Sequence, residues 1–224
     1  VAQRIAHEIK NPLTPIQLSA QRLRRRLARL DPEDQRLVSE CTAAIIEEVE
    51  GLKRLVDEFS RFARMPAFAP RPTDVRPLVD GVATLYRESH PALTITTHHA
   101  DDLPPAMVDA DHVKRAVLNL VDNAVHAVDG AGTVRVETAT APGTGRVRIA
   151  VSDDGPGIPA DDRERLFVPH FSTKVAGSGL GLPIVADIAT EHGGTVWVED
   201  NEPRGSRFVI ELPAAATPAV AAAP

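Results

Sequence analysis

Apolar residues repeat every seven positions along the first thirty residues of the chain. Two such lines run three residues apart: Ala6, Leu13, Ala20 and Leu27 on one line, and Ile9, Ile16, Leu23 and Leu30 on the other. A repeat sustained over this length predicts one long helix with a packing seam.

A second helix is predicted after Asp31, which can cap its N-terminus, and Pro32, which can occupy its first position. Its expected seam consists of two further lines: Val38, Ile45, Leu52 and Phe59, and Cys41, Leu55 and Phe62. Two long helices joined by a short turn form an antiparallel hairpin. A lone hairpin leaves much of its apolar stripe in water, so we expect two copies to form a dimeric four-helix bundle. The alternative is a monomeric hairpin that packs on the rest of the chain.

The pattern changes after a proline-punctuated segment, residues 66–72. Helices are then predicted over residues 74–89, 111–128 and 180–191, and strands over 93–98, 133–138, 146–152, 195–199 and 207–212. This order lacks strict strand–helix alternation, so it favours an α+β fold: an α/β sandwich with a mixed sheet covered by helices. We expect a helical domain over 1–65, a linker over 66–72, a second domain over 73–213 and a disordered Ala/Pro-rich tail over 214–224.

Composition narrows the classes of function. The 224 residues are 43% hydrophobic and 25% charged, which is typical of a globular protein. A single cysteine, Cys41, excludes an internal disulfide framework, and the net charge of −6 gives no support for nucleic-acid binding. No apolar run is long enough for a membrane span, so we expect no direct membrane contact by these residues. Because the first residue already has the pattern of a helix interior, we expect the sequence to be a fragment of a longer protein.

The first candidate for chemistry is His7, which falls just outside the predicted seam. Pro12 and Pro15 each remove a helix hydrogen bond within two turns of it, so the helix should bend there. An exposed imidazole beside Glu8 suits a nucleophile, because the carboxylate can accept the proton from the second ring nitrogen. Taken alone, the alternative is that His7 and Glu8 are surface residues without a role in chemistry.

A second candidate lies on the predicted helix over 111–128. Asn119, Asn123 and His126 are spaced four and three residues apart, so they share one helix face. Amide oxygens suit a hard cation such as Mg²⁺. The alternative for this segment alone is a solvated polar face.

Glycine-rich segments follow. Asp153 comes directly after a predicted strand, and its carboxylate could accept a hydrogen bond from the amine of a flat ligand. Gly155 and Gly157, which follow, would let the backbone approach such a ligand closely. Further on, the glycine run over 177–181 opens a helix, an arrangement that binds phosphate, and Lys174 adds a mobile positive charge. Each segment alone is weak support.

In order, these segments are HEIKNP, NxxxN, DxGxG, FSTK and GxGLGL, and they resemble the H, N, G1, F and G2 boxes of bacterial sensor histidine kinases. The resemblance covers residues 1 to about 213 and is strongest to the NtrY-type nitrogen-regulation sensors. It implies a HisKA-type dimerisation and phosphotransfer hairpin followed by a GHKL-type catalytic domain with a Bergerat-type ATP pocket.

The resemblance also implies a role for each candidate residue. His7 would be the phospho-acceptor, Glu8 its base, and Asn11 the residue that orients water for phosphatase activity on a response regulator. The implied ATP and Mg²⁺ site consists of Asn119, Asn123 (the metal ligand), His126, Asp153, Gly155, Gly157, Ile158, Phe171, Thr173, Lys174, Gly179, Leu180, Gly181 and Ser206. One departure is that few residues separate Phe171 from Gly177, so the lid over the phosphates is short.

The implied activity is ATP-dependent autophosphorylation of His7, followed by phosphoryl transfer to an aspartate of a response regulator. The implied partners are a second copy of the chain and that regulator's receiver domain. The expected location is cytoplasmic for this fragment, with the parent protein anchored in the inner membrane. Two alternatives are a GHKL protein with another output, such as a clamp or a kinase of hydroxyl groups, and a dimerisation scaffold without catalysis.

Overall fold

The computed structural model describes residues 13–23, 25, 32–62, 67–168, 171 and 179–215 of the chain. The chain divides into two compact units. The first comprises Val1–Pro66 and Ser172–Leu180, and the second comprises Ala67–Phe171 and Gly181–Pro224.

The first unit contains two helices in contact. Residues 13–23 are helical, and helix α2 spans Pro32–Phe62, so it begins at the predicted proline. Gln17 joins the two helices: its Nε2 donates to Glu50 Oε1 at 3.0 Å, and its Oε1 accepts from Lys53 Nζ. Because the connection between the helices is short, α2 folds back along the first helix, as predicted for a hairpin.

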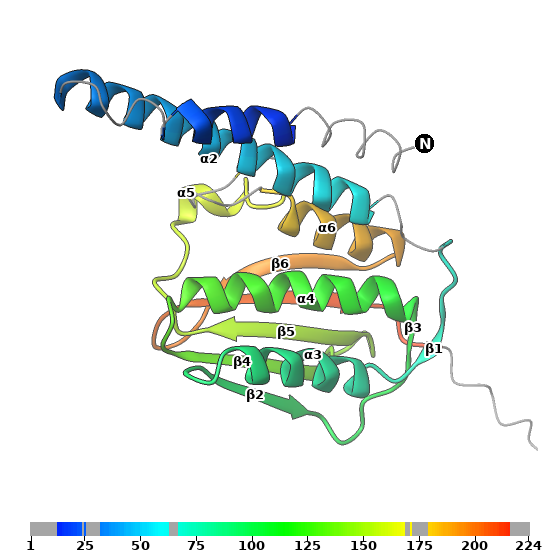
Figure 1. The fold of residues 1–224 in the computed structure, drawn as a ribbon. Coiled ribbons are helices and arrows are strands. Elements are labelled where there is room, and N and C mark those ends of the chain that lie inside the picture. Colours follow the sequence, from blue (N-terminus) through cyan, green and yellow to red (C-terminus); the bar gives the residue numbers. More distant parts are fainter. Residues whose placement is uncertain are drawn as a thin grey trace, which may run out of the picture. The chain divides into compact units, whose positions relative to one another are not determined.

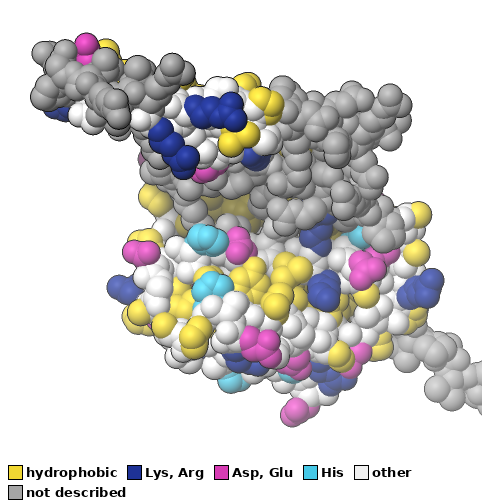
Figure 2. Space-filling model, in the orientation of Figure 1, with side chains coloured by type: hydrophobic (Ala, Val, Ile, Leu, Met, Phe, Trp, Pro, Cys, Tyr) yellow, Lys and Arg dark blue, Asp and Glu magenta, His cyan; other side chains and the backbone are white. Residues whose placement is uncertain are grey.

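The seam between these helices differs from the predicted one. Leu13 and Ala20 are buried as expected, but the buried line of α2 consists of Thr42, Val49 and Val56. The Thr42 hydroxyl is accommodated because it donates to the Val38 carbonyl, one turn earlier, at 2.7 Å. The remaining predicted seam includes side chains that are 39–50% exposed: Ile16, Leu23, Ile45 and Leu52. Figure 2 shows hydrophobic and basic side chains together on the described surface of this unit.

The second unit is built on a five-stranded mixed sheet (Figure 1). The strand order is β2 (Thr94–His99), β4 (Thr133–Thr140), β5 (Val147–Asp153), β7 (Ser206–Leu212) and β6 (Thr195–Asp200). Strands β2 and β4 are parallel, and the other pairs are antiparallel. The predicted mixed sheet is therefore confirmed. Two short strands that the pattern did not predict, β1 (Arg71–Thr73) and β3 (Ala106–Val108), pair with each other.

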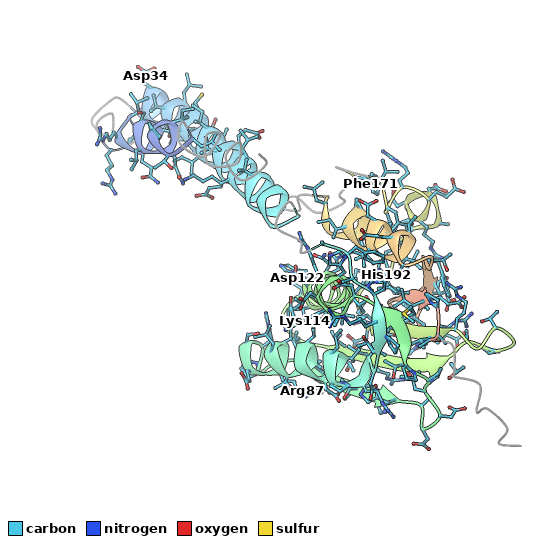
Figure 3. The ribbon with its side chains drawn as sticks, turned by 90° about the vertical axis from the view of Figure 1, so that its right-hand side faces the viewer. Asp34, Arg87, Lys114, Asp122, Phe171 and His192 are labelled. Atoms are coloured by element: carbon cyan, nitrogen blue, oxygen red, sulfur yellow. The ribbon has the colours of Figure 1, made fainter. Side chains whose placement is uncertain are left out.

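Three helices cover one face of this sheet (Figures 1 and 3): α3 (Arg76–Ser89), α4 (Ala110–Ala127) and α6 (Gly181–Glu191). The short helix α5 spans Ala160–Arg163. Helix α4 buries residues at helical spacing, among them Val113, Val117, Leu120 and Ala124. The same apolar face was predicted from the sequence, and it forms the centre of the core.

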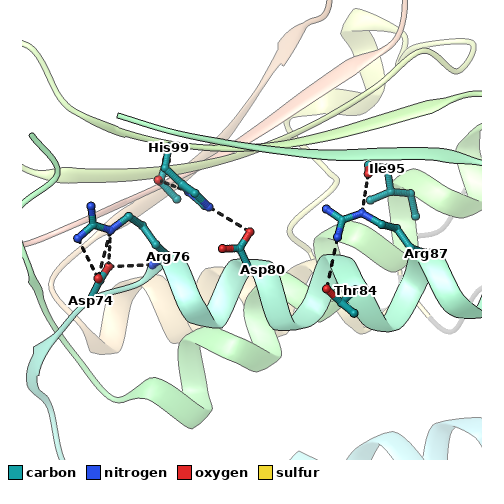
Figure 4. Close-up of polar contacts among 8 residues, drawn as sticks. Asp74, Arg76, Asp80, Thr84, Arg87, Ile95 and His99 are labelled. Carbon is teal, nitrogen blue, oxygen red and sulfur yellow. Dashed lines mark hydrogen bonds and ion pairs between the residues drawn. The ribbon is translucent and has the colours of Figure 1, made fainter. Parts of the chain in front are cut away.

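Polar contacts fix α3 on the edge strand β2 (Figure 4). His99 Nε2 lies 3.1 Å from Asp80 Oδ1, and Arg87 Nε donates to the Ile95 carbonyl at 2.8 Å. Burial alone would raise the pKa of Asp80, but hydrogen bonds from Thr97 and His99 outweigh it and lower that pKa below its ordinary value.

Helix α6 ends at Glu191, as predicted, and a glycine stop follows it. Gly193 has a φ of +64°, and the Gly194 N–H donates to the Ala189 carbonyl at 2.8 Å. This geometry releases the chain directly into β6.

The last described residues correct the expected start of the tail. Ala214 forms a bridge with Ala106, and the Ala215 N–H donates to the Pro105 carbonyl at 2.7 Å. Residues 214 and 215 are therefore hydrogen-bonded to the second unit rather than disordered. Within the described residues, no helix is both long and apolar enough to cross a bilayer.

Candidate functional site

Asp153 ends the buried strand β5 and is itself only 2% exposed. Its Oδ1 accepts from two main-chain donors, the N–H of Gly155 at 3.0 Å and the N–H of Ser206 at 3.3 Å. Two bonds to one oxygen fix the orientation of the carboxylate. The predicted Asp153 and Ser206 are thus brought together, although they lie 53 residues apart in the sequence.

The backbone around the two glycines after Asp153 favours glycine at both positions, for a different reason at each. A Cβ on Gly155 would lie 2.9 Å from the Ala127 carbonyl oxygen, at the last turn of α4. Gly157 has a φ of +80°, a conformation that side chains disfavour. Asp154 has a different role: its Oδ1 accepts from the Thr133 N–H at 2.9 Å, so it holds the loop against β4.

The predicted asparagine face of α4 meets the first residue of α6. A Cβ on Gly181 would lie 3.6 Å from Asn119 Oδ1 and 3.9 Å from Asn123 Nδ2. The Nδ2 atom of Asn119 is buried and has no hydrogen-bond partner within the described part of the chain. A buried amide donor without a partner is costly, so it marks a place where a ligand or water would be stabilising.

His126 lies one turn further along α4 and is exposed. Its Nδ1 lies 2.7 Å from the Asp122 carbonyl oxygen, a distance at which a protonated Nδ1 donates. The Asp122 carboxylate in turn accepts from the Tyr86 hydroxyl on α3 at 3.2 Å; Figure 3 labels Asp122 on α4. Burial, followed by the Asp122 charge, raises the pKa of Tyr86 above its ordinary value. No sequence pattern predicted a role for Tyr86.

The opposite end of α4 is anchored by contacts that the sequence did not predict. Asp109 caps the helix, accepting from the N–H groups of Asp111 and His112, and its Oδ2 accepts from the Ala69 N–H at 3.0 Å. The Asp109 N–H donates to Nε2 of the buried His192, which follows α6, at 2.9 Å (Figure 3). Burial would raise the pKa of Asp109, but the backbone donors outweigh it, so the pKa is lowered.

Figure 2 shows hydrophobic side chains gathered over α4 on the helix-covered face.

The other predicted site residues are distributed as follows. Phe171 carries the Arg165 guanidinium over its ring at 4.3 Å. Ile158 accepts at its carbonyl oxygen from the Arg163 side chain. Gly179 and Leu180 belong to the first compact unit. Five predicted residues lie outside the described part of the chain: His7, Glu8, Asn11, Thr173 and Lys174.

Two family models match the chain. Residues 1–68 match the His Kinase A (phospho-acceptor) domain, and residues 108–216 match the histidine kinase-, DNA gyrase B- and HSP90-like ATPase domain. The two matches follow the order that the sequence motifs predict.

Individual relatives agree. The chain is 40% identical, over 96% of its length, to the nitrogen regulation protein NtrY of Azorhizobium caulinodans, of which it spans only 28%. The catalytic domain of the histidine kinase ThkA is 30% identical with a TM-score of 0.59; the match covers 66% of this chain and 99% of that domain.

Two longer solved structures also match. Full-length ShkA in complex with AMPPNP is 30% identical with a TM-score of 0.67, over 96% of this chain and 46% of that one. ThkA in complex with the response regulator protein TrrA is 26% identical with a TM-score of 0.65, over 95% and 60%. The motif order, the two domain matches and these relatives together show that the chain belongs to the sensor histidine kinases, with a HisKA domain followed by a GHKL-type ATPase domain.

Proposed function

We propose that this chain is the catalytic core of a sensor histidine kinase, which uses ATP to phosphorylate His7 and passes the phosphoryl group to an aspartate of a response regulator. The observation that carries the proposal is the buried Asp153 carboxylate, held in one orientation by the main-chain donors of Gly155 and Ser206. A fixed, buried acceptor of this kind suits the amino group of adenine.

The surroundings of Asp153 fit a flat base. Glycines at 155 and 157 leave the loop after Asp153 without side chains at these two positions. Ile158 supplies an apolar surface in the same loop, and we assign the Ser206 hydroxyl a supporting contact to the base through water. The matching structure of full-length ShkA is a complex with AMPPNP, an analogue of ATP. For this chain, the match to the ATPase domain supports ATP as the nucleotide.

The asparagine face fits the phosphate end. Asn119 presents a buried amide without a described partner, and Asn123 lies beside it against Gly181, where α6 begins. A helix N-terminus attracts anionic groups. We assign Asn123 as the ligand of Mg²⁺, supported by Asn119, since amide oxygens suit this hard cation; Mg²⁺ would neutralise charge on the phosphate oxygens. The resemblance to the family assigns His126, Phe171, Thr173, Lys174, Gly179 and Leu180 to nucleotide binding as well.

The transfer step needs positioning more than covalent help. One nitrogen of neutral His7 forms a bond to the γ-phosphorus as the bond from that phosphorus to the β,γ-bridging oxygen breaks, and ADP leaves. Glu8 accepts the proton from the other ring nitrogen. The phosphoryl group then passes from His7 to a regulator aspartate; the ThkA–TrrA complex is the comparison that supports such a partner. For the phosphatase activity on the response regulator, Asn11 orients a water for attack on the phosphorylated aspartate.

A second copy of the chain is the proposed cover for the exposed apolar side chains of the hairpin. Ile16, Leu23, Ile45 and Leu52 are each between 39% and 50% exposed, and they lie on the heptad lines that the buried seam does not use. Ile45→Glu should therefore convert a dimer to a monomer in analytical ultracentrifugation, whereas Glu47→Gln, an exposed neighbour, should not. A wild-type chain that sediments as a monomer at micromolar concentration would overturn this part of the proposal.

Radiolabelled ATP tests the function directly. The wild type should acquire label that is stable to alkali and lost in acid, as expected for phosphohistidine, and His7→Gln should acquire none. Asp153→Ala should lose ATP binding in calorimetry while retaining its fold. Alkali-labile label would favour a kinase of hydroxyl groups, and absence of any nucleotide binding would favour a scaffold.

A further inference from the structure

The turn between β6 and β7, residues 201–205, reaches Asp153 from a side that the motifs do not describe. Asn201 Nδ2 donates to the Asp153 backbone carbonyl at 2.8 Å. The turn is closed by a bond from the Asn201 N–H to the Gly205 carbonyl at 3.0 Å. Gly205 has a φ of +106°, and a Cβ there would lie 1.8 Å from the Asp153 carbonyl oxygen. The turn and the end of β5 are therefore in tight contact.

A second contact holds the loop after Asp153 to the same turn. Arg163 of α5 donates to the Ile158 carbonyl from Nε at 3.2 Å and from Nη2 at 3.1 Å. The same Nη2 pairs with the carboxylate of Asp200, at the start of the turn. Between this loop and the turn lies a cavity of about 700 Å³, bordered by residues 156–159 and 200–205. Arg163 thus bridges the two walls of that cavity.

We infer that Asn201 and Arg163 are positioning residues that set the base selectivity of the nucleotide site. Asn201 fixes the main chain from which the Asp153 carboxylate extends, and Arg163 fixes the carbonyl of Ile158, whose side chain would cover the base. Neither residue needs to touch the nucleotide. The inference rests on the proposed function, because it takes Asp153 as the acceptor of the adenine amino group.

The chemistry of the base makes this role measurable. Adenine offers an amine donor, whereas hypoxanthine, the base of ITP, offers a carbonyl acceptor at the same position. A rigidly held carboxylate accepts from the amine and repels the carbonyl oxygen, and sites that hydrogen-bond a specific group discriminate strongly against analogues that lack it. A carboxylate that can shift or admit water discriminates less. Substitutions that remove the hydrogen bonds of Asn201 or Arg163 should therefore reduce the preference for ATP over ITP.

The test compares autophosphorylation of the whole chain with ATP and with ITP. We expect Asn201→Ala to raise the KM for ATP about tenfold, to leave kcat within about twofold, and to reduce the ATP:ITP ratio of kcat/KM about tenfold. Arg163→Gln should act in the same direction, and Arg163→Lys should restore part of the ratio. Glu164→Gln, an exposed neighbour of Arg163, should match the wild type in both nucleotides.

A purely structural role would give a different result. If Asn201→Ala and Arg163→Gln lower the melting temperature but keep the wild-type ATP:ITP ratio, the inference is wrong. Should Asn201→Ala fail to fold, the ratio in Arg163→Gln, whose side chain lies on a short surface helix, decides alone. Failure of the proposed function looks different, because the wild type itself would then neither bind ATP nor become labelled.

Discussion

Replacing Asp109 by alanine should destabilise the second unit more than any other single carboxylate change at the start of α4. The side chain is 8% exposed and caps the helix. It accepts from Asp111 N–H at 3.1 Å, from His112 N–H at 3.3 Å and from Ala69 N–H at 3.0 Å. Alanine removes the acceptor for all three donors at once.

The magnitude follows from these bonds. Loss of an N-cap costs about 0.5–2 kcal/mol, and loss of a further bond to a charged acceptor costs about 1.5–3 kcal/mol. Because Ala69 is exposed and water can replace part of that bond, we expect a total of about 2–4 kcal/mol. With a urea m-value of about 2 kcal/mol/M, the unfolding midpoint should fall by about 1–2 M.

Fluorescence of Trp197 provides the assay, since this single tryptophan lies in β6 and reports on the second unit. Asp109→Asn keeps a good capping side chain and should lose less, and Asp111→Ala, on the exposed first turn, should lose about 0.3–1 kcal/mol through the helix dipole. The folded chain holds the pKa of Asp109 below its ordinary value of 3.8, so the charge stabilises the fold above that pH. The difference between wild type and Asp109→Asn should therefore shrink as the pH falls through the lowered folded-state value. Equal midpoint shifts for Asp109→Ala and Asp111→Ala would refute the capping argument.

Three further outcomes are expected. Gly81→Ala, within α3 where a Cβ would meet no other atom within 4 Å, should stabilise the fold by about 0.4–1 kcal/mol in the same urea assay. Gly194→Ala should destabilise the fold by about 1–3 kcal/mol, because its Cβ would lie 2.3 Å from the Glu211 carbonyl oxygen. Effects of the same sign for the two variants would contradict this reasoning. His99→Ala should raise the pKa of Asp80 in a carboxyl NMR titration, and no change would show that the contact at 3.1 Å contributes nothing. Tyr86, the only tyrosine, should resist ionisation at its ordinary pKa of 10.0 in ultraviolet titration, so stability that depends on its neutral form is lost only at higher pH. Ionisation near 10.0 would contradict the effect of its partial burial and of its bond to Asp122.

Local patterns predicted the parts of this chain that local physics determines. The apolar face of α4 and the alternation in β4 follow from spacing alone, and both are observed. Asp153, Gly155 and Asn119 could be chosen because their residue types and spacing match a site chemistry. The roles of these residues remain proposals, but the structure brings Asp153, Gly155 and Ser206 together.

Contacts that depend on distant segments escaped prediction. Asn201 acts on a carbonyl 48 residues earlier, and every residue offers such a carbonyl, so no residue type marks the partner. The buried position of Thr42 in α2 was not predicted, because a threonine adds nothing to an apolar pattern, whereas its hydroxyl is satisfied by the preceding turn. Strands β1 and β3 have three residues each, too few for an alternating pattern to be recognised.

The main-chain donors at Asp153 have a consequence for how such a site can diverge. A side-chain donor disappears with one substitution, but the Ser206 N–H persists whatever residue occupies that position, proline excepted. The Gly155 N–H persists as long as the close approach to Ala127 keeps a glycine there. These two bonds to the carboxylate therefore do not depend on the chemistry of the side chain that Ser206 carries. Evolution can alter the site's preference mainly through the few side chains at its margin, which makes nucleotide recognition robust and its fine tuning separately adjustable.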